Sequence, residues 1–193
     1  MPPQMTRLRA DAQENRDRIL AAAAELFAER GLHVGMREVA RRAGVGPATL
    51  YRRFPTRQAL VDEAFSAEVE ACRRIVEDGC AQADPWTGLT EALRGLLVLN
   101  VRNRGFVDAL LSTMPTGALA QHRRELLGLL DGLAARARDA GRLRADFVID
   151  DLVLVLSAGR GLGAARRELL PSAAHRFADL AIDALRADPV TPR

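Results

Sequence analysis

The sequence predicts an all-α fold of about nine helices. Ala, Leu and Arg dominate the 193 residues, and apolar residues recur every three or four positions with little β-branched alternation. Only 4% of the residues are aromatic, and Gly or Pro stands at several ends of the periodic stretches, where helices stop or start. The length is sufficient for one large domain or two small domains with hydrophobic cores.

Charge is distributed unevenly along the chain. Residues 1–57 contain 11 Arg and 6 acidic residues, a net charge of +5, whereas residues 58–193 contain 17 Arg and 19 acidic residues, a net charge of −2. A basic surplus on one segment is typical of a nucleic-acid-binding domain, although such a surplus is also common on an ordinary solvated face. All 28 basic residues are Arg, which excludes a Walker-A phosphate loop and Schiff-base chemistry, because both need Lys.

The N-terminal part is expected to contain an arm and a first helix. Residues 1–10 predict a flexible arm, in which Arg7 and Arg9 could reach a DNA minor groove or have no function. The helix that follows ends at Gly31 and supports the next two helices. Its apolar face consists of Ile19, Leu20, Ala23, Leu26 and Phe27.

Residues 36–54, MREVARRAGVGPATLYRRF, predict a helix-turn-helix within a domain of residues 11–57. Gly44 can end the first helix in a left-handed conformation, and Gly46 followed by Pro47 suits the start of the second. The inward positions are Val39, Ala40, Ala43, Leu50 and Phe54, and the outward positions are Pro47, Ala48, Thr49, Tyr51, Arg52 and Arg53. The outward guanidinium, hydroxyl and phenol groups fit the phosphates and base edges of a DNA groove.

Six further helices are expected in a C-terminal domain, residues 58–187. Thr56 can cap a long connecting helix from Arg57 to about Asp78, and Asp84 followed by Pro85 is a strong start for the next helix, which ends near Arg102. The remaining helices are expected at about residues 106–111, 119–140, 150–167 and 172–186, before a disordered tail at 188–193.

Three polar residues fall on apolar helix faces. Asn100 shares a face with Leu93, Leu96 and Leu97; His122 with Leu119, Leu126 and Leu129; and Arg160 with Val153 and Leu156. A buried polar group without a partner costs about 1–3 kcal/mol, so each needs a hydrogen bond, a subunit contact or a ligand. Any one of them is explained most simply by a satisfied hydrogen bond or a subunit contact, but together they predict a small-molecule pocket. The residues expected to line it are Leu93, Leu97, Asn100, Phe106, Met114, His122 and Leu126.

Several other functions find no support in the sequence. No metal-spaced His or Cys cluster, paired carboxylates or nucleophile motif is present, so no catalytic residue, metal or cofactor is expected. Gly159, Gly161 and Gly163 do not have the spacing of a dinucleotide-binding loop, and we interpret them as small residues on a dimer helix. Cys72 and Cys80 are about 12 Å apart along one helix, too far for a disulfide. Without a signal peptide or a membrane-spanning run, a cytoplasmic location is expected.

The stretch from Arg16 to Val61 resembles the N-terminal domain of the TetR family of transcriptional regulators. The similarity rests on the Phe-x-x-x-Gly motif at residues 27–31, the Ala-Gly-Val turn at 43–45 and the Thr-Leu-Tyr-x-x-Phe motif at 49–54. Gly35 and residues 46–48 depart from the family, which often has a Ser or Thr cap and Ser-Lys-Gly at these places. The residues expected to contact DNA are Arg37, Pro47, Ala48, Thr49, Tyr51, Arg52, Arg53 and Arg57.

The resemblance also implies how the protein functions. The expected function is a homodimeric repressor that binds a palindromic DNA operator and is released by a small-molecule effector. The last two long helices would pair with their copies as a four-helix bundle, with interface residues Leu156, Arg160, Phe177, Leu180, Ala181 and Ala184. The alternative is a small-molecule-binding or enzymatic helical protein in which the basic N-terminal domain is incidental. A test of DNA binding distinguishes the two hypotheses, because only the repressor is expected to bind DNA.

Overall fold

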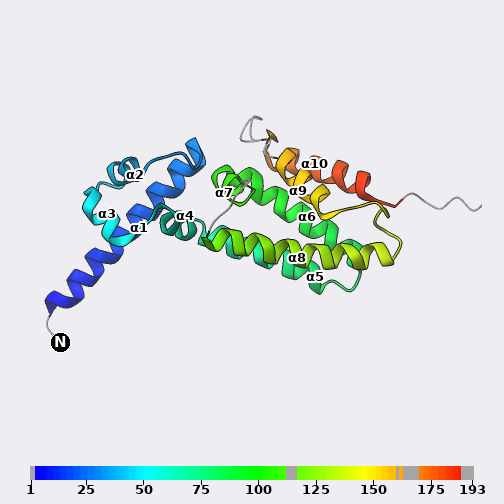
Figure 1. Ribbon diagram of the computed structural model, residues 1–193, viewed down its shortest axis with the longest axis horizontal. Helices are drawn as coiled ribbons and strands as arrows, with labels where there is room; N and C mark the ends of the chain where they lie inside the picture. The colour runs from blue at the N-terminus through cyan, green and yellow to red at the C-terminus, as the bar shows by residue number, and fades with distance from the viewer. Residues whose placement is uncertain (1–2, 112–116, 160, 163–169, 188–193) are drawn as a thin grey trace, which may run out of the picture.

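The computed structural model describes residues 3–111, 117–159, 161–162 and 170–187, and these form ten helices (Figure 1). The helices of the N-terminal domain are α1 (Pro3–Arg30), α2 (Met36–Arg42) and α3 (Pro47–Arg53), and α4 (Arg57–Ala64) joins this domain to the rest. The helices of the C-terminal domain are α5 (Ser66–Ala81), α6 (Pro85–Arg102), α7 (Arg104–Leu110), α8 (Gly117–Asp139), α9 (Ile149–Gly159) and α10 (Leu170–Leu185). The predicted all-α fold with an N-terminal helix-turn-helix is confirmed.

The ends of the helices follow the local signals in the sequence. Gly31, Gly44 and Gly141 have positive φ values of 75°, 65° and 67°, so each takes the left-handed conformation that ends a helix. Gly46 is the N-cap of α3 and Pro47 is its first residue. The Asp84 carboxylate caps α6 by accepting a hydrogen bond from Thr87 N at 3.0 Å.

One expected helix is divided in two. The predicted connecting helix from Arg57 to about Asp78 is interrupted at Phe65, where φ is −107° and ψ is 12°. The interruption accompanies complete burial of the Phe65 ring, whose centroid lies 5.8 Å from that of Phe27 and 5.7 Å from that of Phe106. Periodicity alone did not indicate this break, because apolar residues continue on both sides of it.

The N-terminal arm also differs from the prediction. Residues 3–10 were expected to be flexible, but α1 begins at Pro3 and extends away from the rest of the molecule (Figure 1). The helix is favoured because Pro suits a first helical position and the Arg, Leu, Ala and Gln that follow have high helix propensity. The predicted disordered tail at 188–193 and the end of the helix predicted at 150–167 lie outside the described residues.

The C-terminal domain is built around α6, which packs against α5, α8, α9 and α10. Helices α5 and α6 approach closely at two glycines: a Cβ on Gly79 would lie 2.7 Å from Gly88 O. Both cysteines are free thiols on α5, and burial raises the pKa of Cys72 to about 12. An isolated antiparallel bridge from Leu143 to Arg186 ties the α8–α9 connection to the end of α10. In the described part of the chain, no helix combines the length and apolar character needed to cross a membrane.

We expect Thr56→Ala to destabilise the protein by about 1 kcal/mol, because it removes the N-cap of α4. The Thr56 hydroxyl oxygen accepts a hydrogen bond from Ala59 N at 3.1 Å. Urea unfolding measures the effect, and Thr56→Ser is the matched control because it keeps the hydroxyl group. Equal losses in the two variants would show that the hydroxyl is not the stabilising group.

Candidate DNA-binding surface and effector cavity

The helix-turn-helix has a buried inner face and an exposed outer face. Its inner residues, Val39, Ala40, Ala43, Leu50 and Phe54, are all buried against the core that includes Ile19 and Leu26 of α1. Small Ala40 and Ala43 let α3 cross close to α2, and the turn is held by Val45 N, which donates to Ala40 O at 3.0 Å. The outer face of α3 is therefore fixed in orientation before any ligand binds, which reduces the entropic cost of binding.

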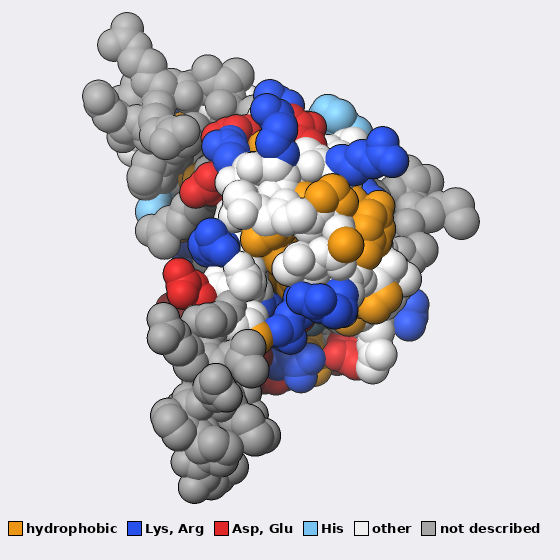
Figure 2. Space-filling model, turned by 90° about the vertical axis from the view of Figure 1, so that its left-hand side faces the viewer, with side chains coloured by type: hydrophobic (Ala, Val, Ile, Leu, Met, Phe, Trp, Pro, Cys, Tyr) orange, Lys and Arg blue, Asp and Glu red, His pale blue; other side chains and the backbone are white. Residues whose placement is uncertain are grey.

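The residues predicted to contact DNA all lie on the outside of this domain. Arg37, Pro47, Ala48, Tyr51, Arg52, Arg53 and Arg57 are exposed, and Thr49 is half-buried. Tyr51 is 47% exposed, which is unusual for a large aromatic side chain in a folded domain. Figure 2 looks onto this end of the molecule, where arginine side chains are spread around exposed apolar and uncharged groups. The surface is thus basic, polar and aromatic, as a DNA-contacting surface requires.

The arginines of this domain fall into two groups. Among residues 12–57, Arg16, Arg30, Arg41 and Arg42 form ion pairs with Glu side chains. In contrast, Arg18, Arg37, Arg52, Arg53 and Arg57 form no ion pair with any residue that the structure describes. The guanidinium groups that remain uncompensated are those of α3 and its surroundings. An uncompensated cation is available to a phosphate group without first breaking an internal ion pair.

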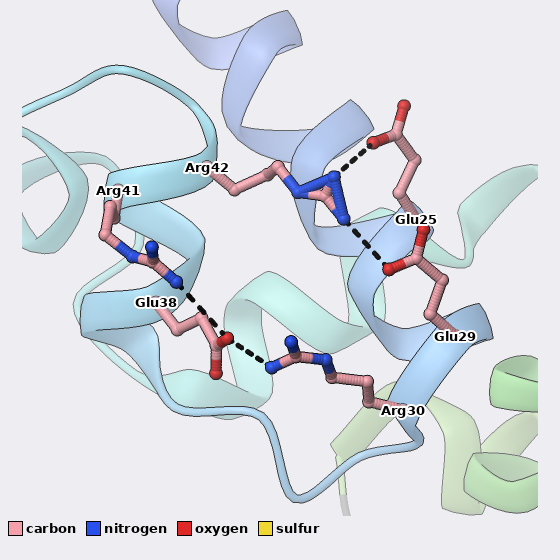
Figure 3. Close-up of polar contacts among 6 residues, drawn as sticks. All are labelled: Glu25, Glu29, Arg30, Glu38, Arg41 and Arg42. Carbon is pink, nitrogen blue, oxygen red and sulfur yellow. Dashed lines mark hydrogen bonds and ion pairs between the residues drawn. The ribbon is translucent and has the colours of Figure 1, made fainter.

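Two of the paired arginines, Arg30 and Arg42, hold α2 against α1 (Figure 3). Arg42 on α2 contacts Glu29 at 2.9 Å and Glu25 at 3.7 Å on α1. Glu38 on α2 accepts from Arg30 on α1 at 2.5 Å and lies 3.6 Å from Arg41. The Arg42 guanidinium is stabilised mainly by the Glu29 hydrogen bond, and this raises its pKa. Three of these contacts join α1 to α2 and hold α2 in place without using the arginines of α3, whereas the Arg41–Glu38 pair lies within α2.

Arg18 is a candidate DNA contact that the sequence interpretation missed. It lies on α1, and its Nη1 atom is 3.9 Å from where a Cβ on Gly44 would be, beside the turn between α2 and α3. Its guanidinium donates to the neutral Asn15 side chain. No local motif marks this residue, because its closeness to the turn results from how α1 crosses the other two helices.

A small, partly open cavity lies within the C-terminal domain, between α5, α6, α7, α8 and α9. Its volume is about 40 Å³, and the described residues that line it are Cys72, Leu96, Asn100, Leu110, Leu111, Arg123, Leu126, Leu127, Leu130, Val153 and Leu156. Eight of these are Leu or Val. The lining is therefore almost entirely aliphatic, with Asn100 and Arg123 as its main polar side chains.

The structure brings together only part of the predicted pocket. Asn100 and Leu126 line the cavity, whereas Leu93, Leu97 and Phe106 are buried in the surrounding core and do not line it. His122 is buried one helical turn from Leu126 but is not part of the lining, and Met114 lies outside the described residues. The prediction that Leu129 lies on the same apolar face as His122 is wrong, because Leu129 is exposed. The missed residues come mainly from α7, α8 and α9, whose packing order the helical periodicity does not specify.

His122 is 3% exposed, and neither of its ring nitrogens has a hydrogen-bond partner among the residues that the structure describes. Burial lowers its pKa, and the nearby Arg73 lowers it further, whereas Glu125 and Glu70 act in the opposite direction. The folded protein therefore favours the neutral imidazole. At pH values below the ordinary pKa of about 6.5, the unfolded chain binds a proton that the folded chain excludes.

We expect the free energy of unfolding to fall as pH decreases below about 6.5, with a slope contributed by His122 of up to about 1.4 kcal/mol per pH unit. This contribution ends once pH passes the lowered pKa of the folded state. His122→Leu removes the titrating group and should flatten that part of the profile. Urea unfolding between pH 5 and pH 8 measures it. His33→Leu is the control variant, because His33 is an exposed histidine. If the free energy of unfolding of His122→Leu varied with pH as in the wild type, His122 would not be the group responsible.

The residues predicted at a dimer interface are divided between the surface and the interior. Leu180 is 55% exposed and Ala184 is exposed on α10, and Phe177 is half-buried. Leu156 and Ala181 are instead buried within the protomer, and Arg160 lies outside the described residues. Leu154 on α9 is 67% exposed and was not predicted. A helix that is apolar on every side, as LVLVL indicates, needs a partner on its outer face as well as its inner face.

The two domains meet where α7 packs against α1. A Cβ on Gly105 would lie 2.5 Å from Phe27 C and 2.9 Å from Ala28 N, so the α7 backbone rests directly on that of α1. The rings of Phe27, Phe65 and Phe106 form one buried cluster beside this contact. Arg57 lies over the Phe27 ring with its Cζ atom 5.9 Å from the centroid. The connecting segment, α1 and α7 are therefore packed as a single unit.

Comparison with known proteins assigns both domains. The family model for bacterial regulatory proteins of the tetR family matches residues 19–64. The model described as the C-terminal domain of SbtR-like transcriptional regulators matches residues 84–187, more than half of the chain.

Individual proteins agree with these matches. The HTH-type transcriptional regulator UidR of Escherichia coli (strain K12) is 38% identical over 67 residues, which is 34% of this chain and 34% of UidR, so the chain aligns with about a third of that relative. The HTH-type transcriptional regulator Mb2274c of Mycobacterium bovis is 30% identical over 142 residues, covering 68% of this chain and 69% of the relative. The crystal structure of the TetR transcriptional regulator SCO0520 from Streptomyces coelicolor has a TM-score of 0.54 and 33% identity, covering 90% of this chain and 99% of that chain. This chain therefore belongs to the TetR family of DNA-binding transcriptional regulators.

Proposed function

We propose that this protein is a homodimeric repressor that binds a palindromic DNA operator and is released from it by a small molecule. The observation that carries the proposal is the set of uncompensated arginines on a preformed helix-turn-helix. In this proposal the protein acts in the cytoplasm, without catalysing a reaction.

The exposed face of α3 is proposed to enter the major groove. Its Thr49, Tyr51 and Arg52 side chains offer a hydroxyl, a phenol and a guanidinium group to base edges and phosphates. Arg37 and Arg57 flank α3 in the sequence at the starts of α2 and α4, where they can contact the phosphates on either side. Arg18 extends this basic surface along α1.

A second copy of the chain is proposed to pair through α9 and α10. Leu154 and Leu180 expose large aliphatic side chains there, and Ala184 is small enough to let two helices approach closely. Two reading helices about 34 Å apart would enter successive major grooves of one palindromic site. The dimer is required for tight binding, since one short helix contacts only half of the site.

The cavity supports a ligand-dependent release of DNA. Leu110 and Leu111 follow Gly105 and Phe106 along and just after α7, so one wall of the cavity belongs to the element that rests on α1. A molecule that enlarges the cavity would displace α7 and with it the packing of Phe27 and Phe65. A preference of a few kcal/mol for the displaced state is sufficient to shift the population away from the DNA-binding geometry.

Selection of bound duplexes from a random pool tests the proposal. The wild-type protein should enrich one palindrome, and gel shifts on that duplex should show an affinity that falls steeply with salt concentration. The selected sequence also identifies the operator and, through its genomic neighbours, the regulated genes. A protein that stays monomeric, or that binds no duplex at low ionic strength, would contradict the proposal.

A further inference from the structure

The chemistry of the effector can be read from the cavity between α5 and α9. Its walls are the aliphatic side chains of Leu and Val, and none of the described residues that line it is aromatic. Burial of an aliphatic group in such a lining is favourable, whereas a charged group would lose its hydration. The lining therefore favours a molecule that is mostly aliphatic.

Asn100 provides a specific polar contact in this lining. It is 8% exposed, and its Nδ2 atom donates a hydrogen bond to Leu156 O at 3.3 Å. Because a backbone carbonyl can only accept, this bond identifies which side of the amide is Nδ2 and leaves Oδ1 as the remaining acceptor. Asn100 Oδ1 accepts no hydrogen bond from the residues that the structure describes. Asn100 therefore offers an occupant of the cavity one acceptor, Oδ1, that a donor group can use.

Arg123 lies at the half-buried edge of the same lining. It already interacts with another residue, so a carboxylate ligand would have to compete with that interaction. A carboxylate head group also cannot donate to Asn100 Oδ1 when it is ionised. A hydroxyl group can donate to Oδ1 while remaining neutral, and it carries a smaller desolvation cost than a carboxylate.

The present size of the cavity adds a second constraint. Its volume of about 40 Å³ is far below the roughly 150 Å³ of an apolar cavity that accepts benzene. An effector must therefore separate the walls as it enters. A flexible aliphatic chain can enter progressively between Leu side chains, whereas a rigid ring system needs the full space at once.

We infer that the effector is a neutral aliphatic alcohol whose chain occupies the leucine-lined cavity and whose hydroxyl group donates to Asn100 Oδ1. This inference rests on the proposed function for its regulatory meaning, but the binding site stands on the cavity and Asn100 alone. The aliphatic chain of the alcohol separates α7 from α8 and α9. The hydroxyl group makes the alcohol bind more tightly than molecules of similar length that lack a donor.

A matched series of probes tests the inference by calorimetry on the full-length protein. The probes are 1-octanol, octyl methyl ether and octanoate, which share an octyl or similar chain and differ in whether the head group donates, only accepts or is charged. We expect 1-octanol to bind about tenfold more tightly than the ether, the ratio for a hydrogen bond worth about 1.4 kcal/mol, and octanoate to bind more weakly than 1-octanol. Tightest binding by octanoate would place the head group at Arg123 and overturn the inference, as would equal binding of alcohol and ether or binding of none of the three.

Variants locate the site. Asn100→Leu should remove the tenfold preference for 1-octanol over the ether, and Val153→Phe should weaken both by filling the cavity. The control is Val98→Phe, which alters a separate surface groove of about 350 Å³ formed by Ile75, Arg94, Val98 and their neighbours. Loss of octanol binding in Val98→Phe but not in Val153→Phe would overturn the inferred site. If octanol binds as expected but the protein selects no DNA, the proposed repressor function fails while the cavity assignment remains.

Discussion

Arg52→Ala will weaken binding of the selected operator at least tenfold while leaving the dimer intact. Arg52 is exposed on α3 and forms no ion pair with the residues described, so its guanidinium is available to DNA. Loss of one arginine contact to a base costs about 1–3 kcal/mol, and a homodimer loses the contact in both half-sites. The Leu50 and Phe54 side chains that hold α3 are untouched, so the fold should be unaffected.

Gel shifts across a range of salt concentrations measure this prediction, together with light scattering for the oligomeric state. If Arg52 contacts a phosphate, the affinity falls for every duplex and the salt dependence becomes shallower by about one unit per contact; if it contacts a base, discrimination between duplexes falls instead. Arg74→Ala is the control, since Arg74 is also an exposed arginine but lies on α5 in the other domain. A monomeric Arg52→Ala protein, or equal losses in the two variants, would mean that α3 is not the reading helix.

Helices α2 and α3 of the helix-turn-helix could be predicted from the sequence because their signals are local. Gly44, Gly46 and Pro47 define the turn within four residues, and the inward and outward faces follow from helical spacing. The same was true of Asp84 and Thr56, whose side chains cap the helices that they precede. In each of these places the residues that decide the conformation are neighbours in the sequence.

The cavity could be predicted only in outline because its walls come from five helices. Asn100 and His122 were correctly expected to be buried polar residues, since each interrupts an apolar face. Only Asn100 reaches the cavity, however, and this depends on how α6 is rotated against α9, where Leu156 O accepts its hydrogen bond. The distinction between a core leucine such as Leu97 and a lining leucine such as Leu96 likewise comes from packing between helices and has no signal in the spacing.

The contact between the domains was absent from the sequence interpretation for the same reason. Gly105 follows Arg104 at the start of α7 with no motif around it, yet its backbone lies against Phe27 and Ala28, more than seventy residues earlier. Phe65 breaks the connecting helix beside this contact. Both features exist because two domains must be packed together, and neither is needed by the helix in which it occurs.

Gly105→Ala should therefore destabilise the contact between α7 and α1, although Gly105 lies outside the helix-turn-helix. The added methyl group would collide with Phe27 O and lie 2.5 Å from Phe27 C, and these are backbone atoms that cannot rotate away. We expect the protein to lose about 1–3 kcal/mol of stability, as overpacked sites do, with α7 displaced from α1. Urea unfolding measures the loss. Gly128→Ala is the matched control: Gly128 is an exposed residue of α8 with no atom near an added Cβ, so alanine should stabilise that helix by about 0.5–1 kcal/mol.

The Gly105→Ala variant also distinguishes whether α7 only supports the fold or also transmits the state of the cavity to the helix-turn-helix. If α7 transmits the state of the cavity to the helix-turn-helix, its displacement in Gly105→Ala should weaken operator binding even without an effector, and adding the effector should then change the affinity little. Hydrogen exchange should also increase in α1 near Phe27, because local opening there no longer requires α7 to leave. Destabilisation with unchanged operator affinity and an unchanged effector response would show that α7 only supports the fold. The signal from the cavity would then have to pass through α4. This helix contacts α8 directly, where the Asp62 carboxylate accepts a hydrogen bond from Ala118 N at 3.3 Å.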